Sequence, residues 1–203
     1  ETPQGIRTGS TVIEVQMAYV NFGSETNLLP SRFKGEAAAV DLPNGKVLFA
    51  LLSSPEHPDW AKTAYQFLIP QQPFQGKLGL KDSPELKQYQ MAMDLKGPQV
   101  LPRYRKANGA PSNESAYPRL VTFQNLNDPT TVAAVDPDNL AASFGSGYRM
   151  KAIVLERTDE PTTDAIRSRI FWMGQYPEPH LDPSKNLYAT GLADSLTRGD
   201  FST

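Results

Sequence analysis

The residues best suited to chemistry are two histidines, His57 and His180, in a chain that holds no cysteine. His57 stands in the sequence Pro-Glu-His-Pro-Asp-Trp, beside Glu56 and Asp59. A carboxylate that orients an imidazole serves general base catalysis or metal binding. The same residues are also typical of a helix start in which Asp59 complements the helix dipole and His57 is exposed. We favour this second interpretation, because His57 lacks a further ligand one helical turn away.

A second group of possible ligands lies near the C-terminus. Glu178, His180 and Asp182 alternate along the chain, and alternation places side chains on one side of an extended strand, where three donors could bind a metal. The prolines between them explain an extended chain without a metal. The calcium-loop pattern at 136–139 fails, because Leu140 stands where a ligand is needed, and capping by an aspartate explains those residues more simply. We therefore predict no metal and no cofactor.

Motifs for catalysis are missing from the sequence. It contains no G-x-S-x-G, P-loop, G-x-G-x-x-G or H-E-x-x-H pattern. Without cysteine it can form no disulfide scaffold, thiol nucleophile or thiolate zinc site. A hydrolase built from two carboxylates stays open, since any two of the 22 acidic residues could meet in space. The expectation is a protein without enzymatic activity.

One dense basic run, Arg103-Tyr104-Arg105-Lys106, has the composition of a phosphate or single-strand contact. The whole chain carries a net charge of −2 and has a pI near 5.7, so it lacks the basic field of a nucleic-acid-binding protein. We therefore expect no nucleic acid, and interpret the run as a solvated loop face or as one rim of a protein interface. The candidate binding residues are His57, Asp59, Trp60, Arg103, Tyr104 and Arg105.

The elements that must position these residues follow from periodicity and turn signals. Alternating apolar residues predict strands at 11–20, 32–42, 46–52, 119–126 and 148–157. Pro43-Asn44-Gly45 predicts a hairpin over 32–52, because Asn-Gly tolerates the positive φ of a tight turn. A partner strand is expected before residue 1. Helices are expected at 58–68, 84–95 and 163–173, with one or two helical turns after each of the Asp-Pro pairs 128–129 and 136–137.

The regions between these elements are rich in proline and glycine. Residues 97–118 lack periodicity, which predicts a long exposed loop. Residues 175–203 are predicted to form an extended tail that wraps the surface. The strands do not alternate with helices as βαβ units, so the fold class is α+β, an antiparallel sheet packed by three to four short helices with long proline-rich loops. A chain of 203 residues is expected to form one domain, 1–203.

Several segments together resemble a group of uncharacterised proteobacterial proteins that carry a membrane anchor or lipoprotein-type signal ahead of a soluble domain. The resemblance covers most of the chain, through ETPQGIRTGSTVIEV, GEAAAVDLPNGKVLFALL, YPEPHLDP and residues 128–163. It implies no activity or ligand. It does imply a location, a domain tethered on the periplasmic side of the bacterial cell envelope by an N-terminal segment that precedes Glu1.

Three functions of different classes remain. We favour a non-enzymatic envelope domain that binds a protein partner, as an accessory subunit of a membrane complex or an immunity-type inhibitor. The alternative is a module that binds a small molecule or an envelope polymer, in which case Trp60, Tyr65 and Trp172 should line a concave pocket. The third is a carboxylate-based hydrolase, which predicts converging buried acids with raised pKa values.

Overall fold

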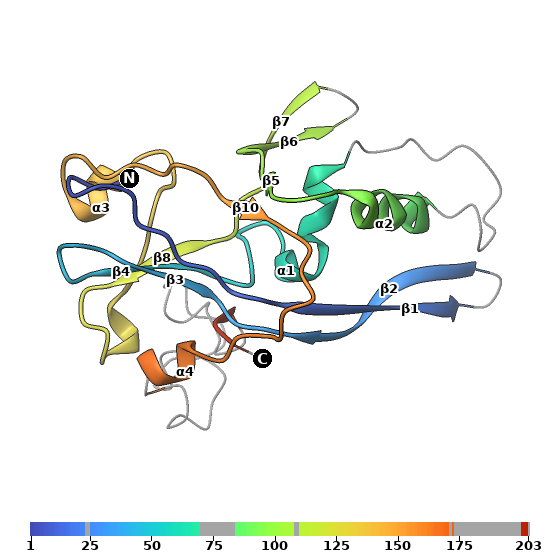
Figure 1. Cartoon of the computed structure of the whole chain (residues 1–203), viewed down its shortest axis with the longest axis horizontal. Coiled ribbons are helices and arrows are strands. Elements are labelled where there is room, and N and C mark those ends of the chain that lie inside the picture. Colours follow the sequence, from blue (N-terminus) through green and yellow to red (C-terminus); the bar gives the residue numbers. More distant parts are fainter. Residues whose placement is uncertain (23–24, 70–83, 108–109, 171, 173–199, 203) are drawn as a thin grey trace.

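The computed structural model describes residues 1–22, 25–69, 84–107, 110–170, 172 and 200–202. Within this part of the chain the fold is α+β, as the sequence predicts (Figure 1). Its centre is a four-stranded antiparallel sheet with the order β3-β4-β8-β9. The strands span Ala38–Asp41 (β3), Val47–Ala50 (β4), Leu120–Phe123 (β8) and Val132–Ala134 (β9).

The hairpin β3–β4 confirms the turn predicted from Pro43-Asn44-Gly45. Ala38 pairs with Ala50, and Asp41 pairs with Val47. Gly45 takes a φ of 77°, which a residue without a Cβ adopts at little cost. The Asn44 side chain accepts a hydrogen bond from the Lys46 N–H at 3.1 Å, so the turn is held by its own sequence.

A long antiparallel ribbon precedes this hairpin. It pairs β1 (Glu14–Phe22) with β2 (Glu25–Lys34) and contains a bulge between Gln16 and Met17. The strand predicted at 32–42 is therefore wrong as one element. Its start belongs to β2 and its end to β3, and residues 35–37 separate them because Gly35 packs against Ile13 and Glu36 is buried. The partner of β1, expected before residue 1, is β2.

The helices are short. The helix predicted at 58–68 is α1 (Trp60–Thr63) followed by the 3₁₀ helix η1 (Ala64–Leu68), and the one at 84–95 is α2 (Pro84–Asp94). The two Asp-Pro starts give η2 (Pro129–Thr131) and α3 (Leu140–Phe144). Asp128 caps the Thr130 N–H, whereas Asp136 accepts from Asp138 N–H in a turn ahead of α3. Of the helix predicted at 163–173, residues 163–170 of the described chain contain one helical turn, α4 (Ile166–Arg169).

Two predictions about loops and strands are wrong. Residues 97–118 contain three strands, β5 (Gln99–Val100), β6 (Tyr104–Ala107) and β7 (Ala110–Ser115). β6 and β7 pair as a hairpin, which projects at the top of Figure 1. The strand predicted at 148–157 is reduced to β10 (Val154–Leu155), which pairs with β5, because the residues before it have no neighbouring strand to bond.

The core holds a residue from the predicted surface tail. Phe201 is 0 % exposed and its ring packs edge-on against Phe49 at 6.0 Å and against Trp172 at 5.9 Å. The Leu52 N–H bonds the Asp200 carbonyl, and the Ala37 N–H bonds the Phe201 carbonyl. Phe201 is therefore part of the core and not of a surface wrap, and its neighbours Asp200 and Ser202 are partly buried. The remainder of the predicted tail, with Glu178, His180 and Asp182, lies outside the described residues.

Candidate functional site

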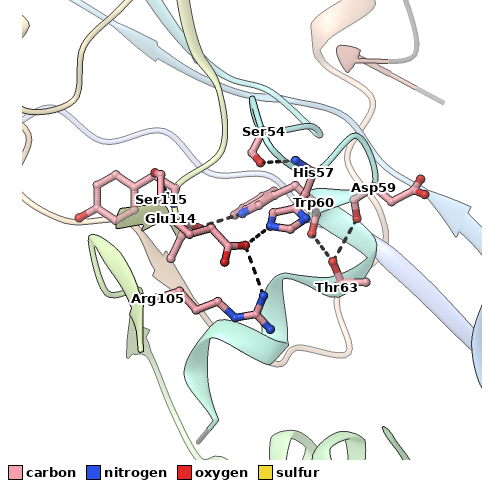
Figure 2. Close-up of polar contacts among 10 residues, drawn as sticks. Ser54, His57, Asp59, Trp60, Thr63, Arg105, Glu114 and Ser115 are labelled. Carbon is pink, nitrogen blue, oxygen red and sulfur yellow. Dashed lines mark hydrogen bonds and ion pairs between the residues drawn. The ribbon is translucent and has the colours of Figure 1, made fainter. Parts of the chain in front are cut away.

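His57 meets an acid that lies far from it in the sequence. Figure 2 shows its ring directed at the carboxylate of Glu114 on β7, with the guanidinium of Arg105 on β6 directed at the same carboxylate oxygen. His57 Nε2 hydrogen-bonds Glu114 Oε1, and Arg105 Nη1 lies 3.3 Å from the same oxygen. The predicted partners, Glu56 and Asp59, are exposed, and neither is hydrogen-bonded to His57. The carboxylate that orients His57 is thus supplied by the β6–β7 hairpin.

An aromatic ring supports this group from one side. The Phe67 centroid lies 5.9 Å from that of His57, and the Arg105 guanidinium lies 5.5 Å from the same ring. The Ser54 hydroxyl accepts a hydrogen bond from the His57 main-chain N–H at 2.9 Å, which fixes the backbone from which the imidazole projects. Loop, helix and hairpin therefore meet at one half-buried cluster, His57, Phe67, Arg105 and Glu114.

The electrostatics of this cluster oppose acid catalysis. Burial favours the neutral form of Glu114, but the hydrogen bond from His57 and the charge of Arg105 outweigh it, so the pKa of Glu114 is lowered. Hydrogen bonds from arginine also lower the pKa of Asp41 and of Asp138. A general acid at neutral pH needs a raised pKa. Glu114 therefore acts as a fixed anion that joins the hairpin to α1 and η1.

The rest of the predicted basic run has a separate role. Arg103 binds Asp138 with both Nε and Nη2, at 2.8 to 3.0 Å, and donates from Nη1 to the Ser115 hydroxyl at 2.6 Å. Its guanidinium lies 4.5 Å from the Tyr104 ring and 5.3 Å from the Tyr117 ring. A forked, stacked arginine of this kind is already satisfied. Arg103 therefore holds the base of the hairpin and is not free to bind phosphate.

Trp60 and Asp59 are not brought into the His57 cluster as ligands. Trp60 is buried, and its indole N–H donates to the Ala116 carbonyl at 2.9 Å. Asp59 is the N-cap of α1 and pairs with Lys62 at 2.5 Å, without a side-chain cap. The helix start is therefore confirmed for the position of Asp59, but the exposed His57 of that interpretation is wrong, because His57 is half-buried against Glu114. Trp60 belongs to a different feature, the cavity.

That cavity has a volume of about 950 Å³ and lies between the sheet, α1, α2 and two extended segments, residues 1–13 and 148–163. Most of its lining is apolar, from all of these elements, and includes Ile13, Val40, Leu48, Trp60, Met93 and Ile153. Two of the three aromatics expected at a concave pocket, Trp60 and Tyr65, line it, whereas Trp172 is buried in the core. Cavities that bind small molecules span roughly 300 to 1,000 Å³ and are mostly apolar.

Two extended segments form one wall of the cavity, the N-terminal segment (residues 1–13) and the connecting segment (residues 148–163). They are joined at both ends. Glu1 and Arg149 exchange main-chain hydrogen bonds of 2.9 and 3.1 Å. At the other end the Thr163 hydroxyl accepts from the Val12 N–H and lies 2.8 Å from the Thr11 hydroxyl. Between these joints no hydrogen bond links the two segments within the described residues, and Figure 1 shows them diverging.

Two glycines let the N-terminal segment and β1 approach the rest of the fold. A Cβ at Gly9 would lie 2.0 Å from the Ala39 carbonyl oxygen on β3, and one at Gly35 would lie 2.4 Å from the Ile13 side chain. Both contacts are closer than any real Cβ allows. The segment therefore lies directly on the edge of the sheet, and its position defines the width of the cavity.

The chain is similar to nothing that would assign the site. No protein-family model, curated protein or solved structure matches it. The described residues hold no cluster of three metal-ligating side chains, and no helix among them is long and apolar enough to cross a membrane. The predicted kinship with envelope-anchored proteins stays a prediction.

The sequence predicts His57 and Arg105 as site residues but not Glu114. Glu114 lies 57 positions after His57, on the β6–β7 hairpin, in a region that the sequence predicts to be a loop. A concave pocket was expected only as an alternative, and two of its three predicted aromatics, Trp60 and Tyr65, line the cavity. Its wall was not predicted, since the segments that form it have no repeating pattern.

Proposed function

We propose that this protein is a non-enzymatic binding module that takes one apolar or amphipathic small molecule into the cavity between the sheet and the two extended segments. The observation that carries the proposal is the apolar cavity of about 950 Å³ framed by segments that are joined only at their ends. A wall without cross-links can separate and close again as a ligand enters. The sequence alternative of a small-molecule module is therefore preferred to the partner-binding one.

The proposal is supported by the chemistry of the lining. Trp60 and Tyr65 contribute large aromatic surfaces, while Met93 and Met150 are flexible and polarisable side chains that adapt to varied apolar shapes. Burying apolar ligand surface there contributes about 25 cal/mol per Å². The perturbed acids have lowered pKa values and are paired, which favours binding over hydrolysis.

The two tryptophans offer a direct test. Trp60 lines the cavity and Trp172 does not, and the chain has no other tryptophan. In Trp172→Phe, the single remaining fluorophore Trp60 should change its emission when dodecanol is added below its solubility limit. In the matched variant Trp60→Phe, the emission of Trp172 should stay constant while circular dichroism reports an intact fold.

A result of the opposite kind would reject the cavity as the site. If dodecanol leaves Trp60 emission unchanged in folded Trp172→Phe, or if it changes Trp172 emission equally, the ligand does not enter this cavity. Calorimetric titration of the unmodified chain with dodecanol supplies the independent measurement, since burial of apolar surface gives a negative heat-capacity change.

A second candidate function, binding of a protein partner in the cell envelope, keeps one observation in its favour. Val100 of β5 and Val154 of β10 are directly paired and are 66 % and 47 % exposed. Adjacent exposed valines on a two-stranded sheet are typical of a contact surface. Replacing Val100, which lies outside the cavity lining, by threonine, which keeps strand propensity, should weaken capture of a partner by the membrane-anchored protein without changing dodecanol binding.

A further inference from the structure

The charged residues that line the cavity are separated by sign along the connecting segment. Arg149 and Lys151 lie at its start, near the joint with Glu1, and Arg7 follows the turn that the Thr2–Gly5 pair closes beside that joint. Glu156, Asp159 and Glu160 lie toward the other end, where Thr163 meets Val12. One end of the cavity is therefore basic and the other acidic.

Among the cations that line the cavity, those at the basic end are the ones that the described residues do not pair. No described residue forms a hydrogen bond or ion pair with the side chains of Arg7, Arg149 or Lys151. The other cations of the lining are engaged, since Lys62 pairs with Asp59 and Arg157 donates to the Met93 carbonyl at 2.9 Å. One carboxylate, that of Glu1, lies at this end against the three cations.

Two acids near the second joint, Glu36 and Glu14, already accept hydrogen bonds within the fold. Glu36 accepts hydrogen bonds from the N–H groups of Ala165 and Ile166, at 2.9 and 2.7 Å, and is buried. Glu14 accepts from the Gln16 side chain at 2.6 Å. Glu156, Asp159 and Glu160 are exposed, as are Arg7, Arg149 and Lys151, so water solvates the charges at both ends of the cavity. An anionic group finds cations that the described residues leave unpaired at the first joint only.

We infer that the ligand is an amphiphile with one apolar chain and one anionic head, a carboxylate or a phosphate ester, and that Arg149 and Lys151, assisted by Arg7, bind the head. The apolar chain lies along Met150, Ile153 and the side chains of the sheet and helices opposite them. This inference rests on the proposed function and adds the chemical class and orientation of the ligand. Charge-assisted hydrogen bonds from arginine and lysine supply the selectivity for the head.

The test compares ligands that share one chain and differ in the head: dodecanoate, dodecyl phosphate, dodecanol and dodecyltrimethylammonium, each below its micelle-forming concentration. Displacement of the neutral dye phenylnaphthylamine from the whole chain gives each Kd. We expect the two anions to bind about tenfold or more tightly than dodecanol at low salt, and the advantage to fall as salt screens the pair. The stronger of dodecanoate and dodecyl phosphate identifies the head.

Three variants connect the selectivity to residues. Arg149→Gln and Lys151→Gln should each raise the Kd of the two anions about three- to tenfold and leave the Kd of dodecanol unchanged. Arg167→Gln is the matched control, because Arg167 is exposed on α4 outside the cavity lining and the variant loses the same unit of charge. Its affinities should equal those of the unmodified chain.

The outcomes separate this inference from the function on which it rests. If dodecanol binds as tightly as the anions, or the ammonium compound binds more tightly, the assigned head group is wrong although the cavity binds apolar chains. Unchanged anion affinity in both Arg149→Gln and Lys151→Gln also overturns it. If neither the dye nor any of the four compounds binds, the proposed function itself fails.

Discussion

Thr163 and Thr11 lie 152 positions apart in the sequence, and their hydroxyl oxygens are 2.8 Å from each other. The same Thr163 hydroxyl accepts the Val12 N–H at 3.2 Å, and the Thr11 hydroxyl is within 2.9 Å of the Glu36 carbonyl. This small group of bonds closes the frame of the cavity at the end opposite Glu1 and Arg149. The cavity therefore depends on contacts between residues that no local pattern links.

Replacing Thr163 by valine tests that closure. Valine keeps the branched shape but loses two hydrogen bonds, so the free energy of unfolding should fall by about 1–2 kcal/mol, measured by urea denaturation. Phenylnaphthylamine should also dissociate faster, because the two segments separate more easily. Thr162→Val is the matched control, since no described partner bonds the Thr162 hydroxyl. Equal stability of the two variants would contradict a joint at Thr163.

Gly9→Ala tests the close contact between the N-terminal segment and β3. The new methyl group would need the space of the Ala39 carbonyl oxygen, 2.0 Å away, so the segment must lift from the sheet. The expected cost is about 1–3 kcal/mol, together with faster proteolysis before residue 13. Ser10→Ala, at the next exposed position, should change neither quantity. A Gly9→Ala protein with the stability of the unmodified chain would place the segment elsewhere.

Glu114→Gln tests the ion-pair cluster through pH. Because His57 and Arg105 lower the pKa of Glu114 in the folded protein, its ionised form stabilises the fold at neutral pH. That contribution is complete above the unfolded value of about 4.3 and is lost as pH falls through the lowered folded pKa. The variant should be less stable by about 1–2 kcal/mol at pH 7, and the difference should shrink below a pH of about 4.

The control for this pH series is Glu56→Gln, which removes an exposed acid from the same loop without touching Glu114. Chemical denaturation of all three proteins at each pH gives the comparison. If the difference between the unmodified chain and Glu114→Gln is constant from neutral to acid pH, ionised Glu114 does not hold the hairpin.

Phe201→Ala tests whether the C-terminal end belongs to the core. The ring is fully buried among Phe49, Phe123 and Trp172, and a buried Phe→Ala change costs about 3–5 kcal/mol. Ser202→Ala should cost less than about 0.5 kcal/mol, because Ser202 contributes main chain to its bridge with Glu36. A small effect of Phe201→Ala on the thermal midpoint would indicate that the Phe201 ring is not buried in the core.

Local signals were sufficient for the elements that carry their own turn or cap. Asn44-Gly45 predicts β3–β4 because the turn bonds within itself, and Pro84 predicts the start of α2 because proline suits a first helical turn. The β6–β7 hairpin had a usable signal as well. The sequence Asn108-Gly109 stands between its strands, but the polar strand residues hide the alternation on which the strand prediction depends.

The rest could not be predicted, because it depends on distant pairing. Residues 148–157 alternate like a strand, yet only Val154 and Leu155 pair with another strand, since β5 is two residues long. Phe201 reads as part of a polar tail until the core forms around it. The partners of His57 and Thr163 lie 57 and 152 positions away, so their contacts follow from topology and not from spacing.

The most direct test of the cavity uses the absence of cysteine from the chain. Met150→Cys places one thiol in the cavity wall, and Gln124→Cys places one at an exposed position outside it. We expect dodecanol to slow alkylation of the Met150→Cys thiol by iodoacetamide at least about tenfold at saturation, and to leave the rate at Gln124→Cys unchanged. Equal rates at Met150→Cys with and without dodecanol would contradict a ligand-binding cavity.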